Sequence, residues 1–410
     1  MKFIELGLGN EVLKAVHQAG YTKPTPIQKE AIPVILQGKD ILGCAQTGTG
    51  KTASFSLPII EILNAGYSKA RMPRSLILEP TRELAAQVAE SFDKYNKSNK
   101  LTYALLIGGV KIDDQLKLID KGVDVLIATP GRLLDLIDNG KLLLSGIKIM
   151  VIDEADRMLD MGFIPDVERI VKISPPLRQT LFFSATMPKE IRVIAEKFLH
   201  NPKEITITPP STVAKTIKQY LTIVPEDKKI NALKYILENE PKSNSIIFCN
   251  RKIDINKLSI SLAKIGLENK ELHGNLSQHE RTKTLKNFKE GKISILICSD
   301  VAARGIDIEA LPLVILYDIP KHPEDYVHRI GRTGRAGSAG KAISIATKHD
   351  NKYISAIQDL TKTEFEIIEI KNLPRVKFNQ NEDVNKKKNI SEPLLGMGSH
   401  TPEFMIIDYK

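Results

Sequence analysis

The stretch Ala45–Thr52, Ala-Gln-Thr-Gly-Thr-Gly-Lys-Thr, contains the residue types that bind the phosphates of a nucleoside triphosphate. It follows the apolar run 40–44, an expected strand, and precedes an expected helix that starts near Ala53. Glycines let backbone N–H groups approach phosphate oxygens, and a helix start adds partial positive charge. Lys51 is expected on the β- and γ-phosphates and the Thr52 hydroxyl on Mg²⁺.

Two features of this loop keep a plainer interpretation open. Ala45 stands at the first glycine position of the pattern, which suits a phosphate loop only if that residue needs no left-handed backbone. A tight turn between a strand and a helix can also end in Gly-Lys-Thr without binding a ligand. The choice between a phosphate-binding loop and a plain turn therefore depends on the other motifs. Its predicted nucleotide-binding residues are Ala45, Gln46, Thr47, Gly48, Thr49, Gly50, Lys51 and Thr52.

Asp153–Asp156, Asp-Glu-Ala-Asp, follows the apolar run 149–152, so its first carboxylate is expected at a strand tip. Asp153 there can hold Mg²⁺ while Glu154 orients and deprotonates an attacking water. The alternative is a solvated acidic turn at the start of a helix, where Asp and Glu are favourable. The phosphate loop about a hundred residues upstream favours catalysis.

The segment His328–Arg335 places arginines three residues apart, at 329, 332 and 335. They are expected to share one helical face or one tight loop and to make poor core residues. One interpretation is a basic surface for RNA phosphates. The other is that the arginines reach the γ-phosphate when two domains close, where such groups raise the rate by about 10³ to 10⁵.

Residues 3–38 are expected to be helical, with a rigid proline-containing loop at 20–28. That loop can be a simple connector between helices. A connector does not require Gln28, however, and a carboxamide can pair with N6 and N7 of adenine. Phe3 can supply a stacking face for the base.

Short apolar runs alternate with helical stretches, which is typical of a parallel sheet flanked by helices. In the first half the expected strands after the phosphate loop are 75–78, 103–107, 123–128, 147–152 and 180–183. Each is followed by a polar or glycine-rich cluster, and these clusters should share the carboxyl edge of the sheet. In the second half the runs are 217–224, 245–248, 294–297, 313–316 and 342–346, with no second phosphate loop.

This alternation predicts an N-terminal domain at 1–205 and a C-terminal domain at 217–371. Residues 201–216 contain three prolines and break the pattern, and 206–216 is the predicted linker. The segment 372–410 is polar and basic, and is expected to be largely disordered.

The composition favours a polyanionic partner. The 410 residues suit two domains, the net charge is +10, and the pI is about 9.2. Tryptophan is absent and aromatic residues make up only 5%, so extensive stacking on bases is excluded as the main mode of nucleic-acid contact. Binding directed at the nucleic-acid backbone is expected instead.

Cys44, Cys249 and Cys298 are odd in number and widely separated, which favours reduced, buried thiols and no zinc site. The N-terminus lacks an apolar signal segment, and no apolar run reaches the length needed to span a bilayer. A soluble cytoplasmic protein without membrane contact, and a monomer, is expected.

With these motifs in order, the sequence resembles the DEAD-box ATP-dependent RNA helicases of helicase superfamily 2, from Phe3 to about residue 346. The resemblance implies two tandem RecA-like domains, each a mostly parallel sheet flanked by helices, joined by a short linker. It also implies RNA-stimulated hydrolysis of ATP with Mg²⁺. Arg332 and Arg335 would then be catalytic, together with Lys51, Asp153 and Glu154.

The family's remaining functional residues carry over position by position. Phe3 matches the aromatic residue that stacks on adenine, Gln28 the adenine-reading glutamine, and Gly305 and Asp307 residues near the ribose. Ser184, Thr186 and His328 match residues that couple hydrolysis to strand separation. The implied RNA contacts are Pro80, Thr81, Arg82, Gly108, Gly109, Thr129, Pro130, Arg132, Gln278, Arg281, Ser299 and Asp300. Phe248 falls in the same RNA-side motifs.

Two positions depart from the family pattern. Ser299 replaces the usual threonine and keeps a hydroxyl, whereas Leu316 replaces a common asparagine and loses a polar group. The compact core and short tail resemble the small bacterial group of the family called RhlE-like. The tail at 372–410 is expected to recruit ribonucleoprotein or RNA-decay proteins.

The resemblance predicts a mechanism in which ATP and RNA together stabilise a closed form, so that each ligand favours binding of the other. Closure would crowd one RNA strand and separate short duplexes locally. Three alternatives stay open at this point: a DNA-directed ATPase, an ATP-gated RNA clamp, and a scaffold that does not hydrolyse ATP.

Overall fold

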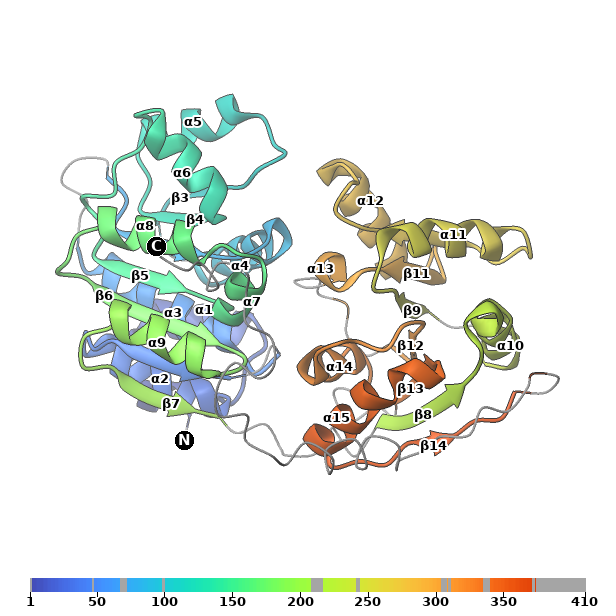
Figure 1. The fold of residues 1–410 in the computed structure, drawn as a ribbon. Helices are drawn as coiled ribbons and strands as arrows, with labels where there is room; N and C mark the ends of the chain where they lie inside the picture. The colour runs from blue at the N-terminus through green and yellow to red at the C-terminus, as the bar shows by residue number, and fades with distance from the viewer. Residues whose placement is uncertain are drawn as a thin grey trace, which may run out of the picture. The chain divides into compact units, whose positions relative to one another are not determined.

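The computed structural model describes residues 2–45, 48–66, 72–97, 100–207, 217–240, 244–303, 308, 311–334, 340–370 and 373. The chain divides into two compact units. The first comprises residues 1–212, 272–292 and 298–309, and the second comprises 213–271, 293–297 and 310–410. Each unit is described here by itself (Figure 1). The predicted domain and linker boundaries, 1–205, 206–216 and 217–371, stay predictions, and most of 206–216 and 372–410 lies outside the described residues.

The first seven-stranded sheet has the strand order β3-β4-β2-β5-β6-β1-β7, and its strands pair in parallel. Its strands are β1 (Ile41–Cys44), β2 (Ser75–Leu78), β3 (Tyr103–Leu106), β4 (Val125–Ala128), β5 (Ile149–Ile152), β6 (Gln179–Ser184) and β7 (Lys203–Thr206). Because all run the same way, the loops that follow β1, β2, β4, β5 and β6 meet at one edge of the sheet. This confirms the predicted sheet edge.

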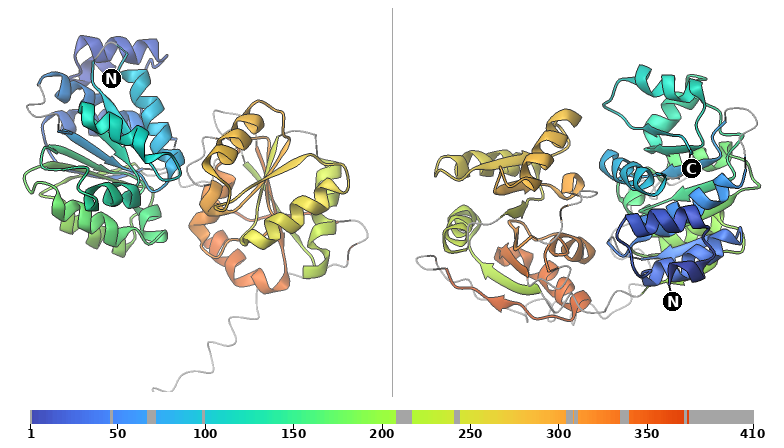
Figure 2. Two further views of the ribbon diagram at one scale, coloured as in Figure 1. Left: turned by 90° about the horizontal axis from the view of Figure 1, so that it is seen from above. Right: turned by 180° about the vertical axis from the view of Figure 1, so that it is seen from behind.

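Helices cover both faces of the first sheet, which each of the views in Figure 2 shows. Side chains of α1 to α4 pack on one face and those of α6 to α9 on the other. The 3₁₀ helix η1 (Phe3–Leu6) precedes them. The helices are α1 (Asn10–Gln18), α2 (Pro26–Leu36), α3 (Lys51–Asn64), α4 (Arg82–Tyr95), α5 (Ile112–Lys121), α6 (Pro130–Asp138), α7 (Ala155–Asp160), α8 (Ile164–Ile173) and α9 (Lys189–Phe198).

The second seven-stranded sheet has the order β10-β11-β9-β12-β13-β8-β14. Its strands are β8 (Ile217–Ile223), β9 (Ser245–Phe248), β10 (Asn269–Leu272), β11 (Ile295–Cys298), β12 (Leu313–Leu316), β13 (Gly340–Ala346) and β14 (Glu366–Ile367). The helices in this half of the chain are η2 (Glu226–Lys228), α10 (Lys229–Asn239), α11 (Lys252–Ala263), α12 (Gln278–Lys289), α13 (Asp300–Ala303), α14 (Pro323–Ile330), η3 (Lys348–Asp350) and α15 (Asn351–Thr361), of which α12 and α13 belong to the first compact unit. The fold class predicted from the sequence is therefore confirmed.

Three strands were not predicted: β7, β10 and β14. Residues 203–206 were expected to be irregular, but they form the edge strand β7 beside β1. All three strands lie at sheet edges, and their side chains are mostly exposed or half-buried. An edge strand has only one neighbour and needs few apolar residues, so no apolar run marks it in the sequence.

Candidate functional site

The loop after β1 enters α3 through Gly50, whose backbone is left-handed (φ +90°). A Cβ atom at Gly50 would lie 2.5 Å from Gln28 Nε2 and 3.0 Å from Thr25 Oγ1. The left-handed backbone favours glycine at this position, and the nearby side-chain atoms would have to shift to admit a Cβ atom, as the phosphate-loop interpretation expects. Gly48 is also left-handed (φ +83°). Gln46 and Thr47 lie outside the described residues.

Lys51 is the first residue of α3, and only 4% of it is exposed. Its Nζ atom lies 2.7 Å from Glu154 Oε1 and 3.5 Å from Asp153 Oδ1. Burial opposes the charged form of Lys51, but the carboxylates of Asp153 and Glu154 outweigh it and raise the pKa of the amine. Taking these charges out of water is costly, and their mutual pairing offsets that cost.

Asp153, Glu154 and Arg157 are buried and Asp156 is half-buried, which excludes a fully solvated acidic turn. Glu154 has a left-handed backbone (φ 53°, ψ 47°), a strained conformation for a residue with a side chain. The Glu154 N–H donates to Asp153 Oδ1 at 2.8 Å, and Arg157 Nε lies 3.1 Å from Glu154 Oε2. Burial raises the pKa of Asp153, against the opposing effect of Lys51. The Glu154 carboxylate is thus oriented by a lysine on one oxygen and an arginine on the other.

Asp156 joins this turn to the loop after β6. Its Oδ2 atom accepts hydrogen bonds from the Thr186 hydroxyl and the Thr186 N–H, both at 2.9 Å. The Asp156 N–H donates to the Ser184 hydroxyl at 3.2 Å. Ser184 and Thr186, predicted as coupling residues, therefore contact the acidic motif directly.

Gln28 connects the start of α2 to the phosphate loop. Its Oε1 accepts from the Thr25 N–H at 3.0 Å, which completes a capping box, and its Nε2 donates to the Gly50 carbonyl at 3.1 Å. Contact with adenine stays a prediction for Gln28. Phe3 packs in the core with 6% of its surface exposed, so its stacking on adenine also stays a prediction.

The residues present fit a nucleotide with Mg²⁺. No group of three or more His, Cys, Asp and Glu side chains in the described part of the chain could hold a metal ion alone. Mg²⁺ in phosphate sites keeps several waters and combines one or two carboxylates with substrate phosphates. Asp153 supplies the carboxylate, the half-buried Thr52 a hydroxyl, and the glycine loop the space that phosphates need.

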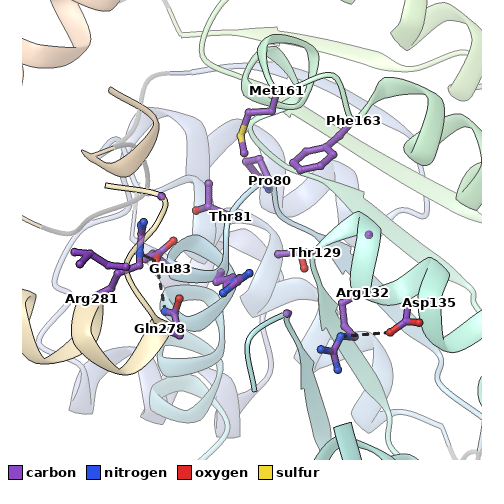
Figure 3. Close-up of a pocket in the computed structure, with 15 residues that line it drawn as sticks. Pro80, Thr81, Glu83, Thr129, Arg132, Asp135, Met161, Phe163, Gln278 and Arg281 are labelled. Atoms are coloured by element: carbon purple, nitrogen blue, oxygen red, sulfur yellow. Dashed lines mark hydrogen bonds and ion pairs between the residues drawn. The ribbon is translucent and has the colours of Figure 1, made fainter. Parts of the chain in front are cut away.

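A cavity of about 530 Å³ lies farther along the edge of the first unit (Figure 3). It is lined by Pro80, Thr81, Arg82, Glu83, Gly108, Thr129, Gly131, Arg132, Asp135, Met161, Phe163, Gly274, Leu276, Gln278 and Arg281. Most of the predicted RNA contacts are thus brought together, although Gly109, Pro130, Ser299 and Asp300 do not line it. Gly109 adjoins it, because a Cβ atom there would collide with the Arg82 guanidinium.

Two of the arginines that line this cavity, Arg132 and Arg281, already have acidic partners. Arg281 Nε lies 2.7 Å from Glu83 Oε1, and Gln278 Nε2 donates to the same oxygen at 3.4 Å. Arg132 Nε lies 3.8 Å from Asp135 Oδ2. An incoming phosphate would therefore compete with carboxylates for these two arginines.

The expectation that the arginines of 329–335 make poor core residues was wrong for Arg329 and for Arg332, both of which are buried. The Arg329 side chain is 2% exposed and donates to the Asp318 carbonyl (2.6 Å) and to Asn250 Oδ1 (2.7 Å). Its guanidinium also lies 5.4 Å from the centre of the Phe248 ring. Partners for all parts of a side chain make an arginine stable in a core, so Arg329 belongs to the scaffold.

The other predicted residues of the second half are only partly described. Arg332 and Ser299 are buried, and His328 and Asp300 are half-buried. Leu316, the departure from the family pattern, is fully buried in β12, where an apolar side chain fits the core. Gly305, Asp307 and Arg335 lie outside the described residues.

Comparison with known proteins decides the family. Residues 25–194 match the DEAD/DEAH box helicase model, and residues 228–337 match the helicase conserved C-terminal domain. The RNA helicase CrhR of Synechocystis is 41% identical over 403 residues, which cover 98% of this chain and 81% of CrhR. The chain belongs to the DEAD-box family of ATP-dependent RNA helicases.

Other relatives agree. The DEAD-box ATP-dependent RNA helicase CshA of Geobacillus kaustophilus is 42% identical, over 89% of this chain and 77% of CshA. The structure of S. cerevisiae Dbp5 bound to RNA and ADP BeF3 matches with a TM-score of 0.80 and 34% identity, covering 90% of this chain and 95% of that one. This DEAD-box helicase therefore hydrolyses ATP, uses Mg²⁺ and acts on RNA. The narrower RhlE-like assignment stays a prediction.

Three residues of the helicase site were not predicted: Glu79, Glu83 and Arg157. Glu79 is fully buried beside the nucleotide site, and burial, followed by the charges of Asp153 and Glu154, raises its pKa well above the usual range. Glu79 precedes and Glu83 follows the motif Pro80-Thr81-Arg82, and Arg157 follows the motif Asp153–Asp156. The predicted roles were assigned to the motif residues and not to these three neighbours. The signal for Glu79 was a lone carboxylate directly after an apolar strand.

No helix in the described part of the helicase is long and apolar enough to cross a membrane. Two of its three cysteines, Cys249 and Cys298, are buried and Cys44 is half-buried, all as free thiols. The buried thiols agree with the sequence-based expectation, and Cys44 is more accessible than expected.

Proposed function

We propose that hydrolysis is carried out by Lys51, Thr52, Asp153 and Glu154. Lys51 binds the β- and γ-phosphates, Thr52 and Asp153 hold the metal ion, and Glu154 takes a proton from the attacking water. Mg²⁺ supplies neutralisation of the charge that develops on the phosphates. When a triphosphate binds, Lys51 exchanges its carboxylate partners for phosphate oxygens, which releases Glu154 Oε1 to act as the base.

One observation carries this assignment: Lys51 is buried against both carboxylates at the start of a helix whose preceding loop favours glycine. An uncompensated lysine at that position would be very costly, so the carboxylates hold the charged amine until a phosphate replaces them. The strained Glu154 backbone supports the same conclusion, because such strain is concentrated at functional sites.

We further propose that RNA is bound through its backbone by the residues around the Figure 3 cavity. Arg82, Arg132 and Arg281 supply positive charge there, and the net charge of +10 favours a polyanion. Gly109 allows the close approach of the Arg82 side chain. Pro80, Thr81, Gly108, Thr129, Pro130, Gln278, Ser299 and Asp300 complete the proposed contacts.

Arg332 and Arg335 are proposed to reach the γ-phosphate on domain closure, with His328 coupling closure to hydrolysis. Support for these three comes from their match to the family motif, as it does for Gly305 and Asp307 beside the ribose and for Phe3 and Gln28 at adenine. Only the state with both ATP and RNA would be closed, so each ligand strengthens binding of the other. The proposed consequence is local separation of short RNA duplexes.

The setting of the helicase is also a proposal. A cytoplasmic location is favoured by the free thiols, two of which are buried, and a monomer is proposed without a structural observation that tests it. Segment 372–410 is proposed to recruit proteins of RNA decay or ribonucleoprotein particles, because it is polar and contains the basic run Lys386-Lys387-Lys388.

The decisive experiment compares ATP hydrolysis by the full chain with no nucleic acid, with single-stranded RNA, and with DNA of equal length. Stimulation by RNA alone is expected, together with displacement of one strand from a short RNA duplex. Equal stimulation by DNA would favour the DNA-directed ATPase, and retention of RNA without strand displacement would favour the clamp. Hydrolysis at the same rate with and without nucleic acid would contradict the proposal.

A further inference from the structure

Glu79 is a buried carboxyl group that the roles above do not use. It follows β2 directly, and the sheet register places it beside Asp153, because Leu78 pairs with Ile152. The Asp153 N–H donates to the Leu78 carbonyl at 3.1 Å, so the two strands remain paired up to this point. Side chains in register on parallel strands point to the same face of the sheet. Glu79 and Asp153 are therefore neighbours at the edge that holds the nucleotide.

The surroundings of Glu79 are charged rather than apolar. The carboxylates of Asp153 and Glu154 and the cations of Lys51 and Arg157 all act on its carboxyl group. None of the Glu79 surface is exposed (0%), and neither carboxyl oxygen has a hydrogen-bond partner among the described residues. Glu79 thus places two carboxyl oxygens in the proposed nucleotide site, and neither oxygen accepts a hydrogen bond from a described residue.

The nearby cations do not serve Glu79. Lys51 is engaged by Glu154 and Asp153, and Arg157 Nε by Glu154. Arg157 Nη1 and Nη2 are buried and also lack hydrogen-bond partners among the described residues, so this guanidinium does not reach Glu79. The donors for Glu79 must come from something that joins the site.

A buried carboxyl group without partners reduces the stability of a protein, whichever protonation state it adopts. Such a group at an active-site edge is explained when the functional complex supplies the missing partners. The site accepts Mg²⁺, and Mg²⁺ in phosphate sites keeps several of its waters. Metal-bound waters are hydrogen-bond donors, and these are what the Glu79 oxygens lack.

We propose that Glu79 is a positioning residue of the Mg²⁺–nucleotide site, whose carboxyl oxygens accept hydrogen bonds from waters bound to the metal ion. The inference rests on the proposed function, since it takes Asp153 as the residue that holds the metal. Partners of this kind orient the inner ligands, and their loss commonly reduces metal affinity by about 10- to 100-fold.

The test is Glu79→Gln, which keeps the side-chain volume and removes the carboxylate. ADP binding by the full chain is measured by calorimetry at a series of Mg²⁺ concentrations and again in EDTA. The Mg²⁺ concentration that gives half of the gain in ADP affinity is expected to rise about 10-fold or more. ADP affinity in EDTA should stay within about twofold, and the Tm of the nucleotide-free protein should not fall, because an ionisable buried carboxyl group is replaced by a neutral amide of the same volume.

Two further variants exclude a purely structural explanation. Ser75→Ala removes a buried hydroxyl without a partner at the opposite end of β2, and it should leave the Mg²⁺ dependence unchanged. Glu79→Asp keeps a carboxylate and should weaken the Mg²⁺ dependence less than Glu79→Gln does. Equal weakening by the two Glu79 variants would assign the effect to packing and overturn the proposal.

Two outcomes of the main measurement would also overturn it. One is an unchanged Mg²⁺ dependence in Glu79→Gln. The other is a loss of ADP affinity that is equal with Mg²⁺ and in EDTA, which would place Glu79 in support of the phosphate loop. A different result would contradict the proposed function itself. In that result, the unmutated protein shows no gain in ADP affinity when Mg²⁺ is added.

Discussion

The carboxyl edges of the two sheets both bury charged side chains, and they differ in how completely those charges are partnered. In the second unit, Arg329 is held by Asn250 and the Asp318 carbonyl, and the Asp318 carboxylate pairs with Lys229 and accepts the Asn250 N–H. No buried charged side chain among the described residues of that unit lacks hydrogen-bond partners. This network is complete without a ligand.

At the edge of the first sheet, some of the buried charged side chains that the structure describes lack hydrogen-bond partners. Both oxygens of Glu79 and both Nη atoms of Arg157 are buried without hydrogen bonds among the described residues. Among the described residues, Lys51 Nζ pairs with Asp153 and Glu154, the two carboxylates proposed to act in hydrolysis. The second sheet thus carries a polar network in which the buried charges are partnered, and this network stabilises the fold. The first sheet carries a network in which some buried charges lack partners that a ligand can supply. In the first unit, the described buried charges with unpartnered atoms include Glu79 and Arg157 beside the proposed nucleotide site, together with Arg132 and Arg178 elsewhere.

Replacing Glu154 by Gln gives the largest expected effect on this comparison. Loss of the general base should reduce kcat for ATP hydrolysis by about 10² to 10⁴-fold, while ATP and RNA binding persist. Steady-state hydrolysis with saturating RNA measures the change, and Glu168→Gln, at a solvent-exposed pair with Lys197, is the matched control. Turnover near the unmutated rate would remove Glu154 from the role of base.

Replacing Arg329 by Ala tests the polar network of the second sheet. The substitution leaves Asn250 and the Asp318 carbonyl without their charged donor, so the free energy of unfolding should fall by about 3 kcal/mol. Arg329→Lys keeps the charge but not the planar fork, so its free energy of unfolding should lie between those of Arg329→Ala and the unmutated protein. Urea titrations measure both. Normal stability with loss of RNA-stimulated hydrolysis would move Arg329 into the functional machinery and break the comparison.

Replacing Gly50 by Ala tests the glycine of the phosphate loop. The new Cβ atom would meet Gln28 Nε2 at 2.5 Å in a left-handed backbone, so ADP affinity measured by calorimetry should fall about tenfold or more. Gly140→Ala is the matched control, because Gly140 is also left-handed (φ +65°) but has open space around it. An equal loss of affinity in the two variants would indicate general loosening of the fold rather than a change at the loop.

The sequence predicted the central strands because they are buried on both faces and therefore read as continuous apolar runs. It did not predict β7, β10 and β14, whose edge positions require few apolar side chains. It also predicted which loops meet at the first sheet edge, since that follows from parallel strands alone.

Partnership between side chains could not be predicted in the same way. The spacing groups Arg329 with Arg332 and Arg335 as poor core residues, but the environment of Arg329 depends on Asp318, 11 residues away, and on Asn250, 79 residues away. Glu79 was passed over because its burial and lack of partners exist only in the folded sheet. Long-range packing fixes these properties, and local spacing does not contain them.

Thr186→Ala gives the smallest expected effect and tests the connection between the network of the first sheet and the work of the helicase. It removes the hydroxyl donor to Asp156 but keeps the N–H donor, both of which lie at 2.9 Å. One hydrogen bond to a charged group contributes about 1.5 to 3 kcal/mol, so duplexes separated per ATP hydrolysed should fall about tenfold, while hydrolysis itself changes little. Thr186→Ser keeps the hydroxyl and should retain most of the coupling. If the two variants lose strand separation and hydrolysis in parallel, Thr186 supports the catalytic turn as a whole, and the link from Asp156 to the β6 loop has no separate coupling role.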